Sequence, residues 1–228
     1  MRVLGIDAAG RHGWVAVLLE RGRFVDARVG GLDELVAWAE PVQVIAVDIP
    51  IGQVAGDVRR CDLEAKAFLG AARSSVFPAP PAAVLTIDDY ALANEQLSAR
   101  GAPKMSRQAW ALIPRVVETA RLAAHDERVR EVHPEVSFRE MTGGSLGSSK
   151  KSWTGLARRH IALEDVGISL PGELPGAGHV PADDVVDAAA AAWSAHRIAT
   201  GVARSLPPEP ETPVGDAPSG GGGVAIWV

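Results

Sequence analysis

Apolar residues near the start of the chain fall into short continuous runs that turn-forming residues separate. Residues 3–7 and 14–19 have the pattern of buried strands, and a glycine-containing turn joins them. Residues 24–29 form a third run of this kind, which two glycines close. The pattern predicts three consecutive strands connected by short turns.

An amphipathic helix and a fourth buried strand follow. Apolar residues within 32–40 recur on one helical face, and Pro41 ends the segment. The run at 42–47 is continuously apolar and stops at Asp48. Because a helical crossover returns a strand parallel to an earlier one, we expect the strands at 3–7 and 42–47 to lie side by side.

The middle of the chain predicts a helical insertion. Residues 53–128 have mainly helical patterns, with a loop at 74–83. A long helical stretch at 106–126 contains Pro114, which either begins its second half or kinks it. Strand character resumes over 129–138, so a fifth strand is expected there.

The last part of the chain contains its clearest helix. A polar loop rich in glycine and serine at 142–152 leads to a helix near 153–164, and a helix with five consecutive alanines follows at 183–199. We expect residues 1–204 to form a single α/β domain, and residues 205–228 to be a proline- and glycine-rich tail. Its closing "VAIWV" is expected either to dock as a terminal strand or to mediate self-association, as in a homodimer.

Aspartates stand where the two parallel strands end and on one face of the last helix. Active sites of open sheets lie beyond the carboxyl ends of parallel strands, where Asp7 and Asp48 are expected. Asp184 and Asp187 are three residues apart and therefore share a helical face. The small alanines behind them would let this helix lie close to the sheet. The sequence therefore predicts that four carboxylates from distant parts of the chain converge.

Ordinary structural roles account for some of these acids. Asp183 follows Pro181 at the helix start and is expected to be an N-cap. Asp184 suits the helix dipole as well as a ligand role. Asp187 lies a full turn inside the helix, where neither explanation applies, so a functional role is favoured for it.

Gathered carboxylates need a counter-charge. Two of them about 4 Å apart repel by roughly 4 kcal/mol at an effective dielectric near 20. A divalent cation relieves this repulsion, and ligation by oxygen alone favours Mg²⁺ or Mn²⁺. The predicted metal ligands and catalytic residues are Asp7, Asp48, Asp184 and Asp187, with Glu131 and Glu135, which flank His133 on the expected fifth strand, as additional catalytic candidates.

Composition argues against a disulfide-bonded, secreted or membrane protein. The 228 residues carry a net charge of −5 and a single cysteine, Cys61, which excludes an internal disulfide. No apolar run approaches the roughly 18 residues that span a bilayer, and no secretion signal is recognisable, so we expect a cytoplasmic protein that does not enter membranes.

Two stretches without acidic residues combine basic and aromatic side chains, at 96–115 and 142–160. Such a combination suits phosphates and stacked bases, although a solvated helix face is the alternative for either stretch. The candidate nucleic-acid-binding residues are Arg73, Lys104, Arg107, Trp110, Lys150, Lys151, Arg158 and Arg159.

An ordered series of motifs extends from residue 3 to about 200. It comprises "GIDAAG…GW", "VDIPIG", "RxCD" at 59–62, "SSVFP", "SxQAW" at 106–110, "EVHPE", "KKSWTGLARR" and "DDVVDAAAAAW". In these motifs the chain resembles domain-of-unknown-function family 429, which is usually described as predicted nucleases with a ribonuclease H-like fold.

The resemblance implies an architecture and a reaction. It implies a mixed five-stranded sheet in the order 3-2-1-4-5, with strand two antiparallel and helices on both faces. The family's acids map onto Asp7, Asp48, Asp184 and Asp187, with Glu131 or Glu135 as an addition. The pair of acids on the last helix is closer to Holliday-junction resolvases than to ribonuclease H proper. The implied activity is metal-dependent hydrolysis of phosphodiesters in DNA or RNA.

Other functions remain open at this point. An ATP-binding phosphotransferase of the actin and sugar-kinase type opens with a similar strand and aspartate, but it normally repeats the motif in a second domain. A non-catalytic nucleic-acid-binding module on the same scaffold predicts that the acids do not converge, or that one is buried in a salt bridge to Arg59 or Arg73. A hydrolase of small phosphorylated metabolites would use the same metals. Serine or cysteine nucleophile chemistry finds little support, since no histidine lies near Cys61 in the sequence.

Overall fold

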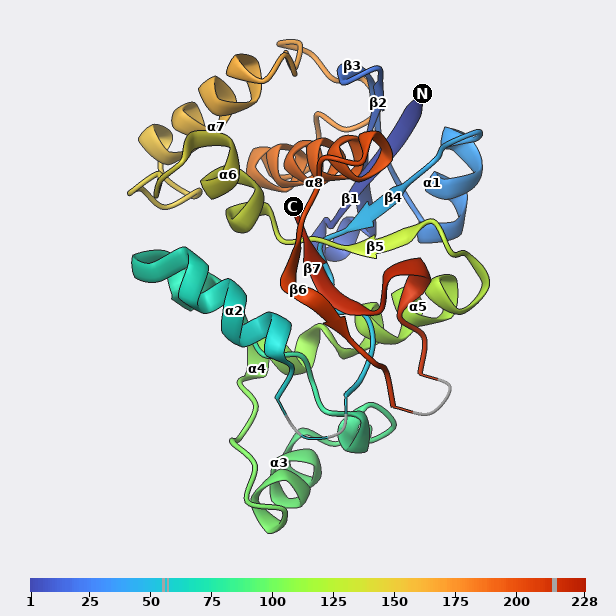
Figure 1. Ribbon diagram of the computed structural model, residues 1–228, viewed down its shortest axis with the longest axis vertical. Helices are drawn as coiled ribbons and strands as arrows, with labels where there is room; N and C mark the ends of the chain where they lie inside the picture. The colour runs from blue at the N-terminus through green and yellow to red at the C-terminus, as the bar shows by residue number, and fades with distance from the viewer. Residues whose placement is uncertain (55, 57, 215–216) are drawn as a thin grey trace.

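The computed structural model describes residues 1–54, 56, 58–214 and 217–228 and shows a mixed α/β architecture (Figure 1). Five strands form the main sheet in the order β3-β2-β1-β4-β5, and two more form a hairpin near the C-terminus. The strands are β1 (Arg2–Ala8), β2 (Trp14–Glu20), β3 (Arg23–Gly30), β4 (Ile45–Val47), β5 (Val129–Glu131), β6 (Ser205–Glu211) and β7 (Val224–Trp227).

The strand order and directions agree with the prediction. β2 pairs antiparallel with both β1 and β3, whereas β4 pairs parallel with β1 and with β5. In the central pair, Leu4 is opposite Ile45 and Ile6 is opposite Val47. The residue that follows Ile6 is Asp7, and the residue that follows Val47 is Asp48. The two aspartates therefore lie side by side at the same edge of the sheet.

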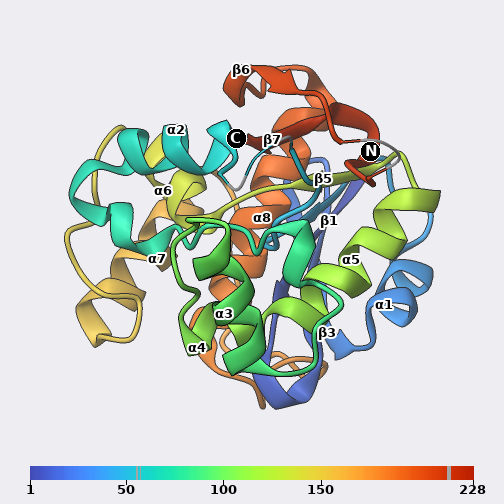
Figure 2. The same cartoon turned by 90° about the horizontal axis from the view of Figure 1, so that it is seen from below.

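Helices cover both faces of the sheet (Figure 2). The core on one face is formed with α6, α7 and α8, and the core on the other with α1 and α5. The described α-helices are α1 (Leu32–Ala39), α2 (Arg60–Leu69), α3 (Tyr90–Ala99), α4 (Arg107–Ala111), α5 (Ile113–His125), α6 (Pro134–Thr142), α7 (Trp153–Asp165) and α8 (Ala182–Thr200). Among the short 3-10 helices, η2 (Gly70–Ser75) follows α2 directly.

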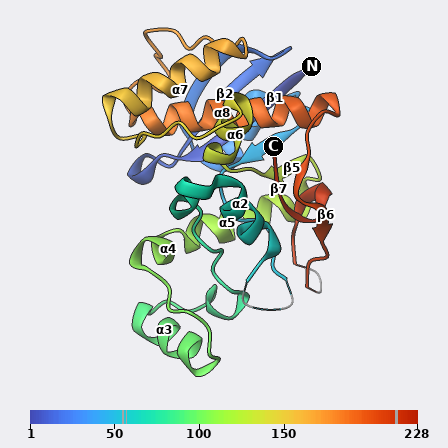
Figure 3. The ribbon, with the colours of Figure 1, turned by 60° about the vertical axis from the view of Figure 1, so that its left-hand side comes forward.

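The segment between β4 and β5 is helical, as expected, and it has a small core of its own. Residues from α3, α4 and the start of α5 bury Ala93, Leu97 and Ile113 together. Figures 1 and 3 show α3 far from the sheet. Pro114 lies in the first turn of α5, so it begins the second half of the predicted stretch.

The strand expected at 129–138 is shorter than predicted. β5 ends at Glu131, and α6 begins at Pro134. Proline cannot donate a backbone hydrogen bond to a strand, and its fixed φ suits the first turn of a helix. Glu135 therefore lies in the first turn of α6 and not on the fifth strand.

The C-terminal residues pack into the main core. Val224, Ile226 and Val228 are buried in the same cluster as the alanines of α8. β7 pairs with β6, and Trp227 makes a parallel bridge to Val132, just beyond β5. The C-terminal residues therefore pack as a strand next to the β5 edge of the sheet.

The backbones of α8 and β1 are in direct contact at Gly5, with no room for a side chain between them. A Cβ atom added to Gly5 would lie 2.0 Å from the backbone nitrogen of Ala192 and 2.3 Å from the carbonyl oxygen of Ala188. Ala188 to Ala192 are completely buried. Glycine on the strand and alanines on the helix therefore let the two backbones touch, which fixes the distance of α8 from the sheet.

We predict that Gly5→Ala destabilises the protein by about 1–3 kcal/mol or more, because the added methyl group meets backbone atoms that cannot rotate away. Thermal unfolding should show a melting temperature several degrees lower. Gly172→Ala is the matched control, since no atom lies within 4 Å of a Cβ there. Equal stability of the two variants would contradict this close packing.

Candidate active site

Because side chains alternate between the two faces of a strand, the side chain of Asp7 lies on the sheet face that α8 covers. Val3 belongs to the core on the α8 face, and Gly5 contacts α8, so Asp7, two residues further on, points to the same face. The backbone N–H of Asp48 donates to the carbonyl oxygen of Ile6 at 3.0 Å. The two aspartates therefore follow neighbouring parallel strands at the same edge of the sheet.

The helix α8 supplies the other two acids. Asp184 and Asp187 lie in its first two turns, and Asp187 is only 1% exposed. All four aspartates line one cavity of about 730 Å³. The structure thus brings together Asp7, Asp48, Asp184 and Asp187, as the sequence predicts.

Burial and mutual repulsion raise the pKa values of these carboxyl groups. Burial raises the pKa of Asp7 well above its usual range, and the charges of Asp48 and Asp187 raise it further. Burial also raises the pKa of Asp48 to about 7, although the charge of Lys150 opposes this. The cluster therefore holds protons near neutral pH unless another positive charge enters it.

The same two effects act on the acids of α8. Burial raises the pKa of Asp187 to about 6, against the lowering effect of the nearby Lys150 ammonium. Burial raises the pKa of Asp184 as well, and the charge of Asp183 adds to it. Each of the four carboxyl groups is therefore easier to protonate than an exposed one.

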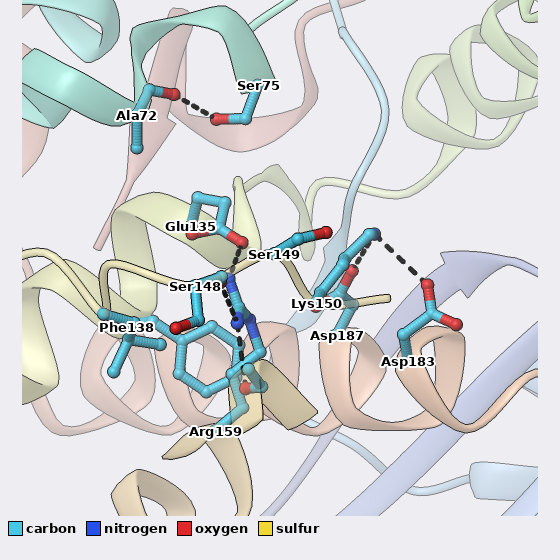
Figure 4. Close-up of polar contacts among 12 residues, drawn as sticks. Ala72, Ser75, Glu135, Phe138, Ser148, Ser149, Lys150, Arg159, Asp183 and Asp187 are labelled. Carbon is cyan, nitrogen blue, oxygen red and sulfur yellow. Dashed lines mark hydrogen bonds and ion pairs between the residues drawn. The ribbon is translucent and has the colours of Figure 1, made fainter. Parts of the chain in front are cut away.

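A lysine supplies the positive charge inside the cluster (Figure 4). The Lys150 ammonium donates a hydrogen bond to Asp187 and lies 3.9 Å from Asp183 Oδ2. Burial acts to lower the pKa of Lys150, but the charges of Asp187 and Asp7 outweigh it, so the pKa lies above its usual value. Lys150 is therefore fully charged and acts as a counter-ion that belongs to the chain.

Lys151 and Asp183, which lie near Lys150, form an ion pair that the sequence does not predict. Lys151 Nζ lies 2.5 Å from Asp183 Oδ2. Asp183 is not the N-cap of α8, because the helix begins at Ala182 and the cap residue is Pro181. The carboxylate of Asp183 instead faces the two lysines. The predicted phosphate-binding role of Lys150 and Lys151 therefore competes with ion pairs inside the protein.

The arginines of α7 are also engaged. The buried Arg159 donates to a carboxylate oxygen of Glu135 and, at 3.1 Å, to the carbonyl oxygen of Ser148 (Figure 4). Arg158 donates to the carbonyl oxygen of Leu146. Both side chains hold the loop that carries Lys150. Glu135 lines the cavity with its negative charge balanced by Arg159.

Glu131 belongs to a separate buried network. Arg59 donates to both carboxylate oxygens of Glu131 at 2.7 Å, and to Asp62 at 2.6 Å. The backbone N–H of Ile51 also donates to Glu131 at 2.6 Å. Cys61, Asp62 and Glu131 lie close enough to hold a metal ion, but Arg59 already balances the two carboxylates. This network fixes the cavity wall and is distinct from the four-aspartate cluster.

The remaining predicted nucleic-acid-binding residues lie on the insertion. The guanidinium of Arg107 stacks 4.6 Å from the ring centroid of Tyr90, and Trp110 packs edge-on against the same ring. Arg73 and Lys104 are exposed, and within the described residues no ion pair or side-chain hydrogen bond involves either.

The cavity lining includes His133, Phe77 and Gln108, which are absent from the predicted site. His133 Nε2 lies 3.3 Å from the carbonyl oxygen of Ser75, and burial lowers the pKa of His133, so its ring is neutral. Phe77 and Gln108 also line the cavity. Each of the three lies inside a motif noted in the sequence, but a lone histidine, phenylalanine or glutamine shows no chemistry before the fold places it.

We predict that Asp7→Asn stabilises the metal-free protein at pH 8.5. The pKa of Asp7 is raised by folding, so its contribution to stability is present at low pH and is lost as the pH rises through that pKa. Thermal unfolding in EDTA should show a gain of several degrees at pH 8.5 and a smaller gain at pH 5.5. Glu95→Gln, an exposed change on α3, is the control. A lower melting temperature for Asp7→Asn at pH 8.5 would refute the proposed repulsion.

Comparisons with known proteins give a family and no closer relative. No curated protein and no solved structure matches the chain. No helix within the described part of the chain is long and apolar enough to cross a membrane. The family model described as "Protein of unknown function (DUF429)" matches residues 5–212, from β1 into β6 and the segment after it. This matched range contains all four aspartates of the cavity. The chain therefore belongs to family DUF429.

Proposed function

We propose that this protein is a divalent-metal-dependent phosphodiester hydrolase that acts on nucleic acid. The single observation that carries the proposal is the convergence of four aspartates at the carboxyl ends of two parallel strands. Among the described residues, the cavity lining has seven carboxylates against three basic side chains. An anionic substrate can approach such a cavity only if cations accompany it.

The donor set fits Mg²⁺ or Mn²⁺. Asp187 Oδ1 is buried and has no hydrogen-bond partner among the described residues, while Lys150 bonds to the other oxygen. A buried carboxylate oxygen without a partner is costly unless a cation joins it. Asp7, Asp48 and Asp187 would hold the ion together with Asp184, through oxygen atoms alone, as these metals prefer.

The reaction follows from what such ions supply. Bound divalent ions lower the pKa of water and stabilise the leaving oxygen of a phosphodiester. A water oxygen forms a bond to phosphorus, the bond from phosphorus to the leaving oxygen breaks, and the proton from water ends on that oxygen. Lys150 would lose its place beside Asp187 to such an ion and would then be free to contact a phosphate oxygen.

Several observations support nucleic acid as the substrate. The sheet order and the positions of the acids are those that the resemblance to ribonuclease H-like nucleases implies. Arg73 and Lys104 are exposed cations without a described partner that could bind phosphates outside the cavity. Cytoplasmic localisation stays a prediction that the single free thiol of Cys61 suits.

The alternatives have less support. A non-catalytic module predicts acids that do not converge or one buried in a salt bridge; Glu131 does pair with Arg59, but the four aspartates share one cavity. A phosphotransferase would need a second copy of the sheet, and the described residues form one five-stranded sheet and one hairpin.

We predict cleavage of single-stranded or branched oligonucleotides that requires Mn²⁺ or Mg²⁺ and stops in EDTA. Asp7→Asn should lower kcat by more than about 100-fold, beyond the 10–100-fold typical of groups that only support a ligand. Glu95→Gln should cleave like the wild type. Cleavage that survives EDTA or Asp7→Asn would show that the proposed reaction is wrong.

We also predict that Lys150→Met binds Mn²⁺ at least about tenfold more tightly than the wild type, a gain of roughly 1.4 kcal/mol, because no ammonium competes for Asp187. Calorimetry at pH 8 measures this affinity. Lys151→Met is the matched control, since Lys151 pairs with Asp183 and does not line the cavity. Weaker Mn²⁺ binding by Lys150→Met than by Lys151→Met would contradict competition between lysine and metal.

A further inference from the structure

The cavity has an apolar wall as well as an acidic cluster. In Figure 4, Ala72 and Ser75 of η2 lie across the cavity from Asp187 and Lys150. The segment that follows η2 and the junction of α4 with α5 supply apolar lining. These side chains are Val76, Phe77, Pro78, Pro80, Leu112 and Val116.

Phe77 is held firmly although its ring is accessible. The side chain is 38% exposed, whereas the preceding Val76 is buried in the main core. Two residues after Phe77, the backbone N–H of Ala79 donates to Asp62 at 3.1 Å. Asp62 is itself fixed by Arg59. The buried network beside the cavity thus fixes the backbone next to Phe77, which lines the same cavity as the four aspartates.

The basic side chains of the cavity cannot bind a row of phosphates. Arg59 pairs with Glu131 and Asp62, and Arg159 pairs with Glu135, whereas Lys150 pairs with Asp187 and would be released only by a metal ion. Within the described lining, these are the basic groups other than His133. A single released lysine does not form a row. A duplex, which needs a track of free cations along its backbone, is therefore a poor fit inside the cavity.

A nucleobase fits the other properties of the cavity. Its face stacks on aromatic rings, and its edge accepts and donates hydrogen bonds. Gln108 is an exposed residue that lines the cavity, and its amide can do both. Among the described residues, no hydrogen bond engages this amide. The volume of about 730 Å³ is in the range of small-molecule sites.

We propose that the cavity binds an unpaired nucleobase, stacked on Phe77 and contacted at its edge by Gln108, with the adjoining phosphate at the four aspartates. The substrate is then a single strand or a frayed end, because the face of a base inside a duplex is covered by its neighbours. The proposal rests on the proposed function in placing the phosphate at the acids.

Binding of two small probes in the presence of Mn²⁺ tests the base site without relying on hydrolysis. Adenosine 5′-monophosphate carries the base and ribose 5-phosphate lacks it. Calorimetry with the wild type should show at least about tenfold tighter binding of the nucleotide. Phe77→Ala should lower the affinity for the nucleotide to that for ribose 5-phosphate and leave the latter unchanged, while Phe77→Tyr should keep the preference.

Trp153→Ala is the matched aromatic control, because Trp153 is 84% exposed and does not line the cavity. It should bind both probes like the wild type. Equal affinity of the wild type for the two probes, an equal loss of both in Phe77→Ala, or a selective loss in Trp153→Ala would each overturn the base site.

Cleavage measurements separate this proposal from the proposed function. The wild type should cleave a single strand at least about tenfold faster than the same strand in a blunt duplex. Selective nucleotide binding without any Mn²⁺-dependent cleavage would refute the nuclease and keep the base site. Mn²⁺-dependent cleavage without preference for the base or for the unpaired strand would do the reverse.

Discussion

The close approach of α8 to β1 sets the distance between the aspartates of α8 and those at the ends of β1 and β4. Gly5 leaves no side chain between the strand and the backbone of α8 at Ala188 and Ala192. A wider spacing, as between ordinary side chains, would carry Asp187 away from Asp7. The small residues at this crossing are therefore as necessary to the site as the aspartates, and the repulsion among the aspartates is what the packing has to overcome.

The protein meets that repulsion in two ways. Burial and neighbouring charges raise the pKa values of the aspartates, so that part of the negative charge is neutralised by protons. The ammonium of Lys150 neutralises another part. Under the proposed function a divalent ion would replace both, since a proton can leave and a lysine on a loop can move. The loop from α6 to α7 is thus tied directly to the chemistry of the site.

Much of this arrangement was predictable from the sequence, because it depends on local patterns. Continuous apolar runs that end in Asp7 and Asp48, with a crossover between them, determine two parallel neighbours. The spacing of Asp184 and Asp187 determines a shared helical face. The strand order 3-2-1-4-5 came from resemblance to a family, since strand periodicity does not choose neighbours.

Other features depend on long-range contacts that no local pattern contains. The pairing of Lys150 with Asp187 joins residues 37 positions apart, and that of Arg59 with Glu131 joins residues 72 positions apart. Basic residues in a stretch without acids are expected from the sequence to be free to bind phosphates. In the fold, however, carboxylates from distant parts of the chain pair with Lys150 and Arg159. The helix at Pro134 was the exception, because proline there was a local signal that apolar periodicity concealed.

A crystal structure with bound Mn²⁺ tests the central claim most directly, that the four aspartates form a cation site which Lys150 occupies in the absence of metal. The account predicts anomalous density among Asp7, Asp48 and Asp187, with the Lys150 ammonium displaced from Asp187. Saturating Mn²⁺ with no anomalous density in the cavity, and with Lys150 still bonded to Asp187, would contradict it.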